Sequence, residues 1–320
     1  MIDFQPIFTA VRQAAEVCKR VQEHHLASSE KTGHEPVTIA DYGSQAILGR
    51  AISSAFPDDA VLAEESGAQF IELVPEARRK EIIALLETIL GIEVRQADVV
   101  RWLDHGHGRE AERTWVIDPI DGTKGFLAMR SYVIAAGVMV DKKPVACVIG
   151  APAYPTTDRG GVMFHAQGGA AFMQPLGGGQ VKRIKVSDRT KAEDVRTLES
   201  VEKSHANHER MQRVREAAGL GAASLTRIDS MEKYARIAAG DGELYLRLPR
   251  IDSTRAFMIW DHAAGTALVQ AAGGLVTDID GSPLDFSQGK ALVNDGIIVS
   301  NGHIHEQVIA AVQKVLAEGE

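Results

Sequence analysis

The middle of the chain, from Thr114 to Pro152, is rich in strand-forming residues and constrains the fold more than any other segment. Three apolar stretches follow one another: WVID at 115–118, SYVIAAGVMV at 131–140 and PVACVIGAP at 144–152. The polar turn DKK joins the second stretch to the third, and this pattern predicts an antiparallel hairpin. With the helical patterns around it, the segment indicates a chain of mixed α and β type.

The residues before this segment predict two long helices, one strand and a charged region. Apolar side chains recur at helical spacing over 4–27, and a second helical face carries Ile47, Leu48, Ala51, Ile52 and Ala55. A short apolar strand, Ala60 to Ala63, then leads to Glu64 and Glu65. We expect residues 75–110 to form two helices and a loop, and we interpret them as a peripheral insertion.

After this segment, glycine-rich pieces at 160–179 separate further short strands. LGGGQ at 176–180 favours a hairpin tip over a phosphate-binding loop, because no helix follows it. Strands and helices alternate from Leu198 to the end, with helices predicted around 263–271 and 304–315. We place a boundary near residue 160, giving an N-terminal domain, 1–160, and a C-terminal domain, 161–320, that share a cleft.

Composition narrows the class of protein. Of the 320 residues, 45% are hydrophobic, enough for a large core without disulfides, and Cys18 and Cys147 lie in apolar stretches typical of buried thiols. The net charge of -8 argues against binding to a nucleic-acid polymer. No secretory signal or apolar run of membrane length is present, so a cytoplasmic protein that does not interact with membranes is expected. A small anionic substrate is still compatible if metal ions and local cations reverse the field in one cleft.

Two carboxylates stand where the first strand of the central segment ends. Asp118 closes the strand WVID, and Asp121 lies in a turn imposed by Pro119 and Gly122. Carboxylates at i and i+3 around such a turn can converge on one point. Because only oxygen donors are present, the expected ligand is a hard cation such as Mg²⁺ rather than Zn²⁺.

The same turn offers further polar groups. It exposes the Ile120 carbonyl as another oxygen ligand, and the amides of Gly122 and Thr123 can meet an anion if they open a helical turn. In any aspartate-rich turn, the aspartates can serve only to form the turn and bind no metal. For this turn taken alone, that interpretation is favoured over a metal site.

Carboxylates elsewhere in the chain favour a metal site over a plain turn. Glu64 and Glu65 end an earlier strand, and Asp261 begins an alanine-rich helix in IWDHAAG, where it could equally be a helix cap. Asp41 lies beside a mostly apolar helical face, where an exposed helix residue is the alternative. Together with Asp118 and Asp121, these residues suggest one acidic site.

Four stretches resemble the lithium-sensitive inositol monophosphatase superfamily. They occur in the family order and span most of the chain: EPVTIADYGSQAIL at 35–48, LAEESG at 62–67, WVIDPIDGTKGFL at 115–127 and IWDHAAGTALVQAAGG at 259–274. The resemblance implies a layered α/β sandwich, with helix layers alternating with mixed sheets and the metals between the two halves. In one departure, Ala63 stands where the family commonly has glycine, from which we expect at most a modest shift of the metal loop.

The resemblance also implies roles for individual residues. Two or three Mg²⁺ ions would be bound by residues that match family ligands: Glu64, Asp118, the Ile120 carbonyl, Asp121 and Asp261. Residues matching Asp41 and Thr123 would orient and deprotonate the attacking water. Inhibition by Li⁺ is a further implication.

Two more stretches resemble the 3'(2'),5'-bisphosphate nucleotidase branch of this superfamily. They are VEKSHANHER at 201–210 and DSMEKYARIAAGDGELYLRLP at 229–249, and the lysine of DGTKGF and the insertion at 75–110 point the same way. The residues implied in substrate binding are Gly122, Thr123, His205, Ser230, Lys233, Arg247 and Asp261. Cations at Lys233 and Arg247 can bind a second phosphate that an inositol monophosphate lacks.

These observations lead to a functional hypothesis with alternatives. The implied reaction is the hydrolysis of adenosine 3',5'-bisphosphate to AMP and phosphate, extending to the sulfated relative of this nucleotide. Alternatives are an inositol monophosphatase and a non-catalytic nucleotide sensor. Lys233 and Arg247 taken alone would be solvated surface charges, and His205 with His208 could suggest a metal pair. The sequence does not fix base preference or oligomeric state.

Overall fold

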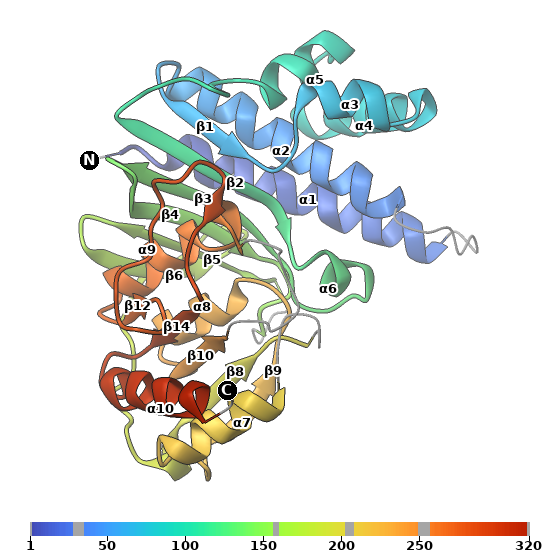
Figure 1. The fold of residues 1–320 in the computed structure, drawn as a ribbon. Coiled ribbons are helices and arrows are strands. Elements are labelled where there is room, and N and C mark those ends of the chain that lie inside the picture. The colour runs from blue at the N-terminus through green and yellow to red at the C-terminus, as the bar shows by residue number, and fades with distance from the viewer. Residues whose placement is uncertain (1, 28–34, 156–159, 202–207, 249–256, 319–320) are drawn as a thin grey trace.

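Layers of helices alternate with β-sheets along the molecule (Figure 1). The computed structural model describes residues 2–27, 35–155, 160–201, 208–248 and 257–318. In Figure 1, helices α1–α5 lie above a seven-stranded sheet, α8 and α9 lie below it, and a five-stranded sheet follows, covered by α7 and α10. The layered α/β sandwich expected from the sequence is confirmed.

The N-terminal helical layer is built on two long helices, α1 (Gln5–Ala27) and α2 (Glu35–Ala55). Ile7, Val11, Ala14 and Cys18 of α1 repeat at helical spacing and are fully buried against the first sheet and α2. Outside them lie the shorter helices α3 (Gly67–Leu73), α4 (Glu76–Leu90) and α5 (Gln96–Leu103).

Helices α4 and α5 are the two helices predicted for residues 75–110, and they form the outer end of this layer (Figure 1). They are nevertheless part of the main core, since Ile82, Leu86 and Trp102 are buried in it. A Cβ atom at Gly49 of α2 would lie 2.1 Å from the Trp102 carbonyl oxygen, so only glycine permits the observed approach of α2 and α5.

The first sheet follows chain order. A parallel pair, β1 (Ala60–Ala63) with β2 (Arg113–Asp121), is continued by antiparallel strands β3 (Val133–Val140), β4 (Lys143–Ala151), β5 (Val162–Gln167), β6 (Ala170–Pro175) and β7 (Lys182–Ile184). The β3–β4 hairpin predicted from the sequence is confirmed. Its turn contains Asp141 and Lys142 with φ of 48° and 61°, the left-handed values that match strand twist in tight hairpins. LGGGQ joins β6 to β7, as expected for a hairpin tip.

The change from the first sheet to the second comes later in the chain than residue 160. The boundary placed near residue 160 falls inside the first sheet, because β5 pairs with β4 and the antiparallel ladder continues to Ile184. Hydrogen bonding therefore changes from one sheet to the other between Ile184 and Arg196, where the next strand begins. Proline and glycine near residue 160 mark the connection between β4 and β5 rather than a change of sheet.

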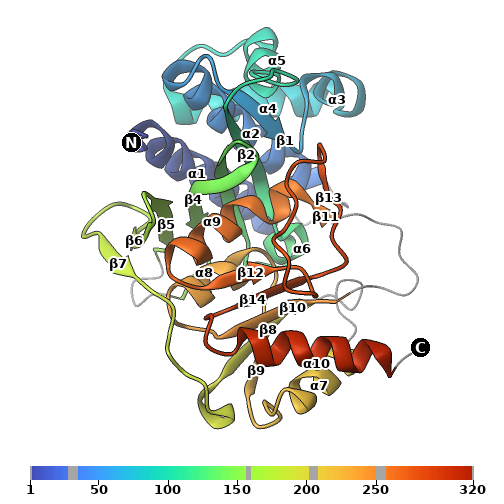
Figure 2. The same cartoon turned by 60° about the vertical axis from the view of Figure 1, so that its left-hand side comes forward.

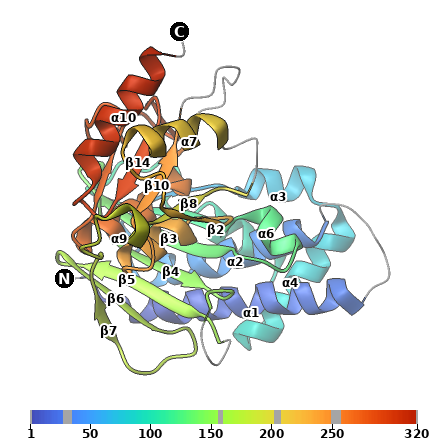
Figure 3. The same ribbon diagram turned by 90° about the horizontal axis from the view of Figure 1, so that it is seen from below.

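The second sheet has the order β12–β14–β10–β8–β9. Its strands are β8 (Arg196–Glu199), β9 (Ser224–Arg227), β10 (Leu244–Arg247), β12 (Leu275–Thr277) and β14 (Ile297–Ser300). Figure 3 shows α7 (His208–Ala217) and α10 (His305–Ala317) across its outer face, where Met211, Val214 and Val312 are buried. A short pair, β11 (Phe257–Met258) with β13 (Ala291–Leu292), completes the strands described.

Helix α9 (Ala263–Ala271) lies between the two sheets, next to α8 (Glu232–Ala238) (Figure 2). Leu268 of α9 shares one buried cluster with Phe164 of the first sheet and Val299 of the second. A Cβ atom at Gly137 of β3 would lie 3.0 Å from the Ala264 nitrogen, which shows how closely α9 approaches the first sheet. The two halves are therefore joined by a continuous core.

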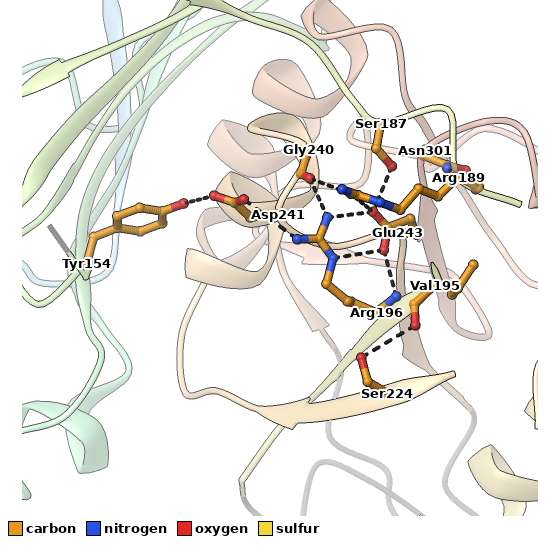
Figure 4. Close-up of polar contacts among 10 residues, drawn as sticks. All are labelled: Tyr154, Ser187, Arg189, Val195, Arg196, Ser224, Gly240, Asp241, Glu243 and Asn301. Atoms are coloured by element: carbon orange, nitrogen blue, oxygen red, sulfur yellow. Dashed lines mark hydrogen bonds and ion pairs between the residues drawn. The ribbon is translucent and has the colours of Figure 1, made fainter. Parts of the chain in front are cut away.

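A polar network around Glu243 also connects parts of the chain that are distant in sequence (Figure 4). The fully buried Glu243 carboxylate accepts hydrogen bonds from Ser187 Oγ at 2.7 Å and from Arg196 Nη2 at 2.8 Å, and forms an ion pair with Arg189 at 3.2 Å. The Tyr154 hydroxyl donates to Asp241 at 2.7 Å. The network ties the β4–β5 connection and the β7–β8 connection to the start of β10.

Both cysteines are free, buried thiols, as predicted. Burial raises the pKa of each to about 12, so neither is a reactive thiolate at neutral pH. Among the helices that the structure describes, none has the length and apolar content needed to cross a membrane.

We predict that Glu243→Ala lowers the free energy of unfolding by roughly 2–4 kcal/mol, because two arginines would lose their buried counter-charge. Urea denaturation followed by circular dichroism measures the change. Glu193→Ala, at an exposed position of the same connection, is the matched control and should shift stability by less than about 0.5 kcal/mol. Equal effects of the two substitutions would contradict a stabilising role for the network.

Candidate active site

The predicted acidic residues lie near the carboxyl ends of two neighbouring parallel strands. In the β1–β2 pair, Ala63 is opposite Ile117, so the next residues, Glu64 just after β1 and Asp118 within β2, come at the same end of the pair. Pairing in this strand is regular through Ala63.

A β-bulge at the end of β2 separates Asp118 from Asp121. Asp118 is opposite Ala135 and Asp121 is opposite Val133, so β2 contains one residue more than β3 over this interval. A bulge of this kind bends the strand and redirects its side chains. The two aspartates can therefore line the same cavity, although the regular alternation of a strand would send residues i and i+3 to opposite faces.

The turn that follows begins the short helix α6 (Thr123–Leu127). Gly122 precedes the helix with φ of 92°, a left-handed value that favours glycine. The Thr123 hydroxyl donates to the Ile120 carbonyl at 3.4 Å, and the Ile120 amide donates to Asp118 Oδ1 at 3.1 Å. These two bonds hold the loop between β2 and α6 in place. The helical turn predicted to open at Gly122 and Thr123 is present as α6.

Glycines in this loop allow a segment of the C-terminal half to pack directly on it. A Cβ at Gly122 would lie 2.7 Å from Ser230 Cβ, and one at Gly125 would lie 2.0 Å from the Ser131 carbonyl oxygen. The Met231 amide donates a hydrogen bond to the Asp121 carboxylate. The second half of the chain therefore helps to orient a predicted metal ligand.

The loop, the strand ends and α8 surround a cavity of about 300 Å³. Most of the residues predicted as site residues line it: Glu64, Asp118, Ile120, Asp121, Gly122, Thr123, Ser230, Lys233, Arg247 and Asp261. Lys124, the lysine of DGTKGF, lines it too. Carboxylates and cations thus share one cavity.

Burial and neighbouring carboxylates raise the pKa of two aspartates in this cavity, Asp118 and Asp121. Burial raises the pKa of Asp118 well above its ordinary value, and the charges of Glu64, Asp121 and Asp261 raise it further. Burial and Asp261 raise the pKa of Asp121 to about 7, against the opposing effect of Lys233. The same repulsion makes the cavity favourable for a cation, which would neutralise it.

The chemistry of the donor set fits Mg²⁺, because carboxylate and carbonyl oxygens are the ligands that a hard divalent cation prefers. In the described ranges, however, no three His, Cys, Asp or Glu side chains converge closely enough to form a metal-binding group as they stand. Closing a coordination shell would therefore require rotations of these carboxylate side chains.

Asp41 lies next to the acidic residues rather than on an exposed helix face. Burial raises its pKa, and the charges of Glu64 and Glu65 raise it further. On the same face of α2, four residues later, the Gln45 side chain donates to the Glu65 carbonyl at 2.6 Å and accepts from the Glu65 amide at 2.9 Å. This pair of bonds holds the loop that carries Glu64 against α2.

Asp261 does not cap the alanine-rich helix. It ends a short 3-10 turn, Ile259–Asp261, and His262 occupies the cap position of α9 without a side-chain capping bond. The alternative of a helix cap is therefore wrong in this structure, and Asp261 instead lines the cavity.

Neither predicted cation is a solvated surface charge. Lys233 is only 4% exposed, and its Nζ donates to the carbonyls of Ile228 at 3.0 Å and Ser230 at 2.6 Å. Burial lowers the Lys233 pKa to about 8, against the opposing charge of Asp121. The Arg247 guanidinium lies 4.5 Å from the centre of the Phe257 ring, and its Nη1 donates to His262 Nε2 at 3.2 Å.

Ser230 adopts φ of 70°, which is uncommon for a residue other than glycine, and the surrounding bonds hold it there. Its Oγ accepts from the Glu232 amide at 3.2 Å and lies 3.2 Å from Ser131 Oγ. The Arg130 side chain donates to Asp229 at 2.9 Å. These contacts connect the start of β3 to the segment that carries Lys233.

Two predictions concern the segment 201–210. His205 lies outside the described residues. His208 is described, and its Nδ1 lies 2.9 Å from the Glu199 carboxylate, which also pairs with Arg215.

Sequence reasoning overlooked several polar groups around the cavity. They are Gln45, the Met231 amide, Tyr234 and His262. Gln45 had a signal, because it follows Asp41 by four residues and shares its helix face. The Met231 amide had none, since every residue type except proline has that donor and only the fold brings it to Asp121.

Comparison with known proteins gives consistent results. A sequence model of the inositol monophosphatase family matches residues 4–317. The chain is 33% identical to the 3'(2'),5'-bisphosphate nucleotidase of Schizosaccharomyces pombe, over 98% of this chain and 96% of the relative. It is 34% identical to that of Emericella nidulans, over 96% of both. Its fold resembles an inositol monophosphatase from Anabaena, with a TM-score of 0.59 at 21% identity over 98% of this chain and 97% of that one.

We predict a pH-dependent stability difference between the wild type and Lys233→Met. The ordinary lysine pKa is 10.5 and the folded value is about 8, so the unfolded chain binds more protons between these values. The wild type should therefore gain stability relative to the variant as pH rises from 8 to 10, by roughly 1–3 kcal/mol. Urea unfolding at pH 7, 8, 9 and 10 measures this difference. A constant difference would show that the lysine titrates normally.

Proposed function

Because this chain belongs to the inositol monophosphatase family, we propose that it is a metal-dependent phosphomonoesterase, specifically a 3'(2'),5'-bisphosphate nucleotidase. The reaction is hydrolysis of adenosine 3',5'-bisphosphate to AMP and phosphate. The observation that carries the proposal is the presence, in one cavity, of the four predicted metal-binding carboxylates, those of Glu64, Asp118, Asp121 and Asp261, together with Lys233 and Arg247. A substrate with two phosphates needs a metal site for the phosphate that is cleaved and cations for the one that remains.

The metal site belongs to this proposal. Two or three Mg²⁺ ions would be held by Glu64, Asp118, Asp121, Asp261 and the Ile120 carbonyl. When bound, they would supply positive charge to the phosphoryl oxygens and the leaving oxygen and lower the pKa of a water molecule.

Asp41 and Thr123 are the proposed residues that orient and deprotonate the attacking water. The raised pKa of Asp41 makes its carboxylate a stronger base than an exposed aspartate, which suits proton transfer near neutral pH. The water oxygen would form a bond to phosphorus as the bond to the ribose oxygen breaks, and the amides of Gly122 and Thr123 would bind the phosphoryl oxygens. Positioning and charge neutralisation supply most of the acceleration in such reactions.

The second phosphate is the proposed ligand of Lys233 and Arg247, with Ser230 and His205 as further contacts. Lys233 presents a compact charge and Arg247 a planar set of donors, and both can form charge-assisted hydrogen bonds to phosphate. Inositol monophosphates have no group for these cations, so the cavity favours the nucleotide.

Inositol monophosphate hydrolysis is the second candidate, and it uses the same carboxylates. The solved inositol monophosphatases support the shared fold at identities below 25% and do not bear on substrate. A non-catalytic sensor is the third candidate. It would be expected to lack a metal ligand or the water-activating pair, whereas this sequence retains Asp41, Thr123 and all four carboxylates.

Several finer features are part of the proposal by family resemblance. They are hydrolysis of the sulfated relative of the substrate, inhibition by Li⁺, a cytoplasmic location, and a role in removing a by-product of sulfate assimilation. A millimolar Li⁺ titration of the Mg²⁺-supported activity tests the second of these.

We predict that the purified protein with Mg²⁺ releases phosphate from adenosine 3',5'-bisphosphate at a kcat/KM at least about tenfold above that for inositol 1-phosphate. Asp121→Asn should reduce the nucleotide activity by about 100-fold or more, because it removes a charged metal ligand at nearly constant volume. Phosphate release in parallel assays measures both values.

Preference for inositol 1-phosphate would keep the metal site and refute the nucleotidase assignment. Tight binding of the nucleotide with no phosphate release at saturating Mg²⁺ would instead support the sensor. Asp188→Asn, at a position away from the cavity lining, controls for a general effect of removing one aspartate.

A further inference from the structure

Arg247 is held from two sides before any substrate binds. The Phe257 ring covers one face of its guanidinium at 4.5 Å, and His262 Nε2 accepts a hydrogen bond from Nη1 at 3.2 Å. Arg247 also lines the cavity. A guanidinium has five N–H donors, so the bond to His262 uses one and leaves others for a ligand.

The bond to Arg247 determines the protonation of His262. Arginine can only donate, so Nε2 must be the unprotonated acceptor nitrogen, and the ring proton is on Nδ1. Nδ1 lies 2.8 Å from the Tyr234 hydroxyl, to which it therefore donates. The Tyr234 oxygen acts as an acceptor in this bond, and its own proton is available to another group.

Tyr234 is placed to use that proton in the cavity. It is 1% exposed and lines the cavity, and across the described ranges its hydroxyl has no hydrogen-bond partner except His262. A Cβ at Gly265 would lie 2.5 Å from Tyr234 Cγ, so the ring is packed directly on the backbone of α9. Tyr245 contacts the ring edge to face, with centroids 5.7 Å apart.

We propose that His262 is a positioning residue that aims the Arg247 guanidinium at the uncleaved phosphate of a nucleoside bisphosphate, and that the Tyr234 hydroxyl is a further donor to this phosphate. This inference rests on the proposed function. His262 is 1% exposed, and both of its ring nitrogens are bonded, one to Arg247 and one to Tyr234, so it acts on the ligand through these partners. Arg247 and Tyr234 both line the cavity and have donors left for the phosphate.

The arrangement favours substrates with a second phosphate over those with one. Holding a long, flexible arginine in its binding rotamer removes the entropy cost of ordering it on binding. A monophosphate does not bind more tightly when Arg247 is ordered in advance, because it has no second phosphate to contact Arg247. His262 is therefore expected to act on the ratio of kcat/KM values for bisphosphate and monophosphate.

The test compares variants of His262 on adenosine 3',5'-bisphosphate and adenosine 3'-phosphate. His262→Leu removes both hydrogen bonds. His262→Gln can place an oxygen acceptor near the Nε2 position and so restore the bond to Arg247, whereas His262→Asn can place a donor only near Nδ1. His305→Leu is the matched control, because His305 is an equally buried, hydrogen-bonded histidine in α10 outside the cavity lining.

We expect His262→Leu to lower the ratio of kcat/KM for the bisphosphate to kcat/KM for the monophosphate about 10- to 100-fold, mainly by raising KM for the bisphosphate. His262→Gln should restore most of this ratio. Tyr234→Phe should lower the ratio about 3- to 10-fold. The inhibition constant of AMP, which retains the uncleaved phosphate, should rise in parallel. His262→Asn should also reduce this ratio of kcat/KM values, whereas His305→Leu should leave it unchanged.

Equal losses on both substrates, or an unchanged ratio in His262→Leu and Tyr234→Phe, would overturn the proposal. If His262→Leu does not fold, His262→Asn and Tyr234→Phe provide the same comparison with smaller changes in volume. A wild-type protein that does not hydrolyse the bisphosphate refutes the proposed function itself, and this result is seen before any variant is measured.

Discussion

The repulsion between the buried Asp118 and the carboxylates around it is the constraint on which the rest of the site depends. Asp118 is 2% exposed, and its pKa is strongly raised by this burial and further by the charges of Glu64, Asp121 and Asp261. Such a group persists only if the fold provides enough stability elsewhere and holds the backbone in place. The β2 bulge, the Gln45 bonds to Glu65 and the Met231 amide on Asp121 do so from three directions.

The positive side of the cavity is constrained in the same way. Lys233 is fixed by two carbonyl oxygens, and Arg247 by an aromatic ring and a histidine. The charges of Lys233 and Arg247 oppose the rise in the Asp121 pKa that burial and Asp261 cause. Preformed groups of both signs reduce the reorganisation that a doubly charged ligand would require.

The sequence predicts much of this architecture because local patterns determine it. Helical spacing in α1, the β3–β4 hairpin and the glycine tip between β6 and β7 all follow from short-range rules. The first sheet continues past the domain boundary predicted near residue 160, because proline and glycine there mark a connection between strands, a pattern equally typical of a domain boundary. Met231, Tyr234 and His262 escaped notice because their roles arise from contacts between segments far apart in the chain.

Helix α9 has a consequence for how the protein is synthesised. It lies between the two sheets and supplies core to both, yet it leaves the ribosome after every strand of the first sheet (Figure 2). Until α9 emerges, the first sheet lacks this cover on its inner face, and Asp261, which comes shortly before α9, cannot complete the cavity lining. A chaperone that shields the bare sheet would act in that interval.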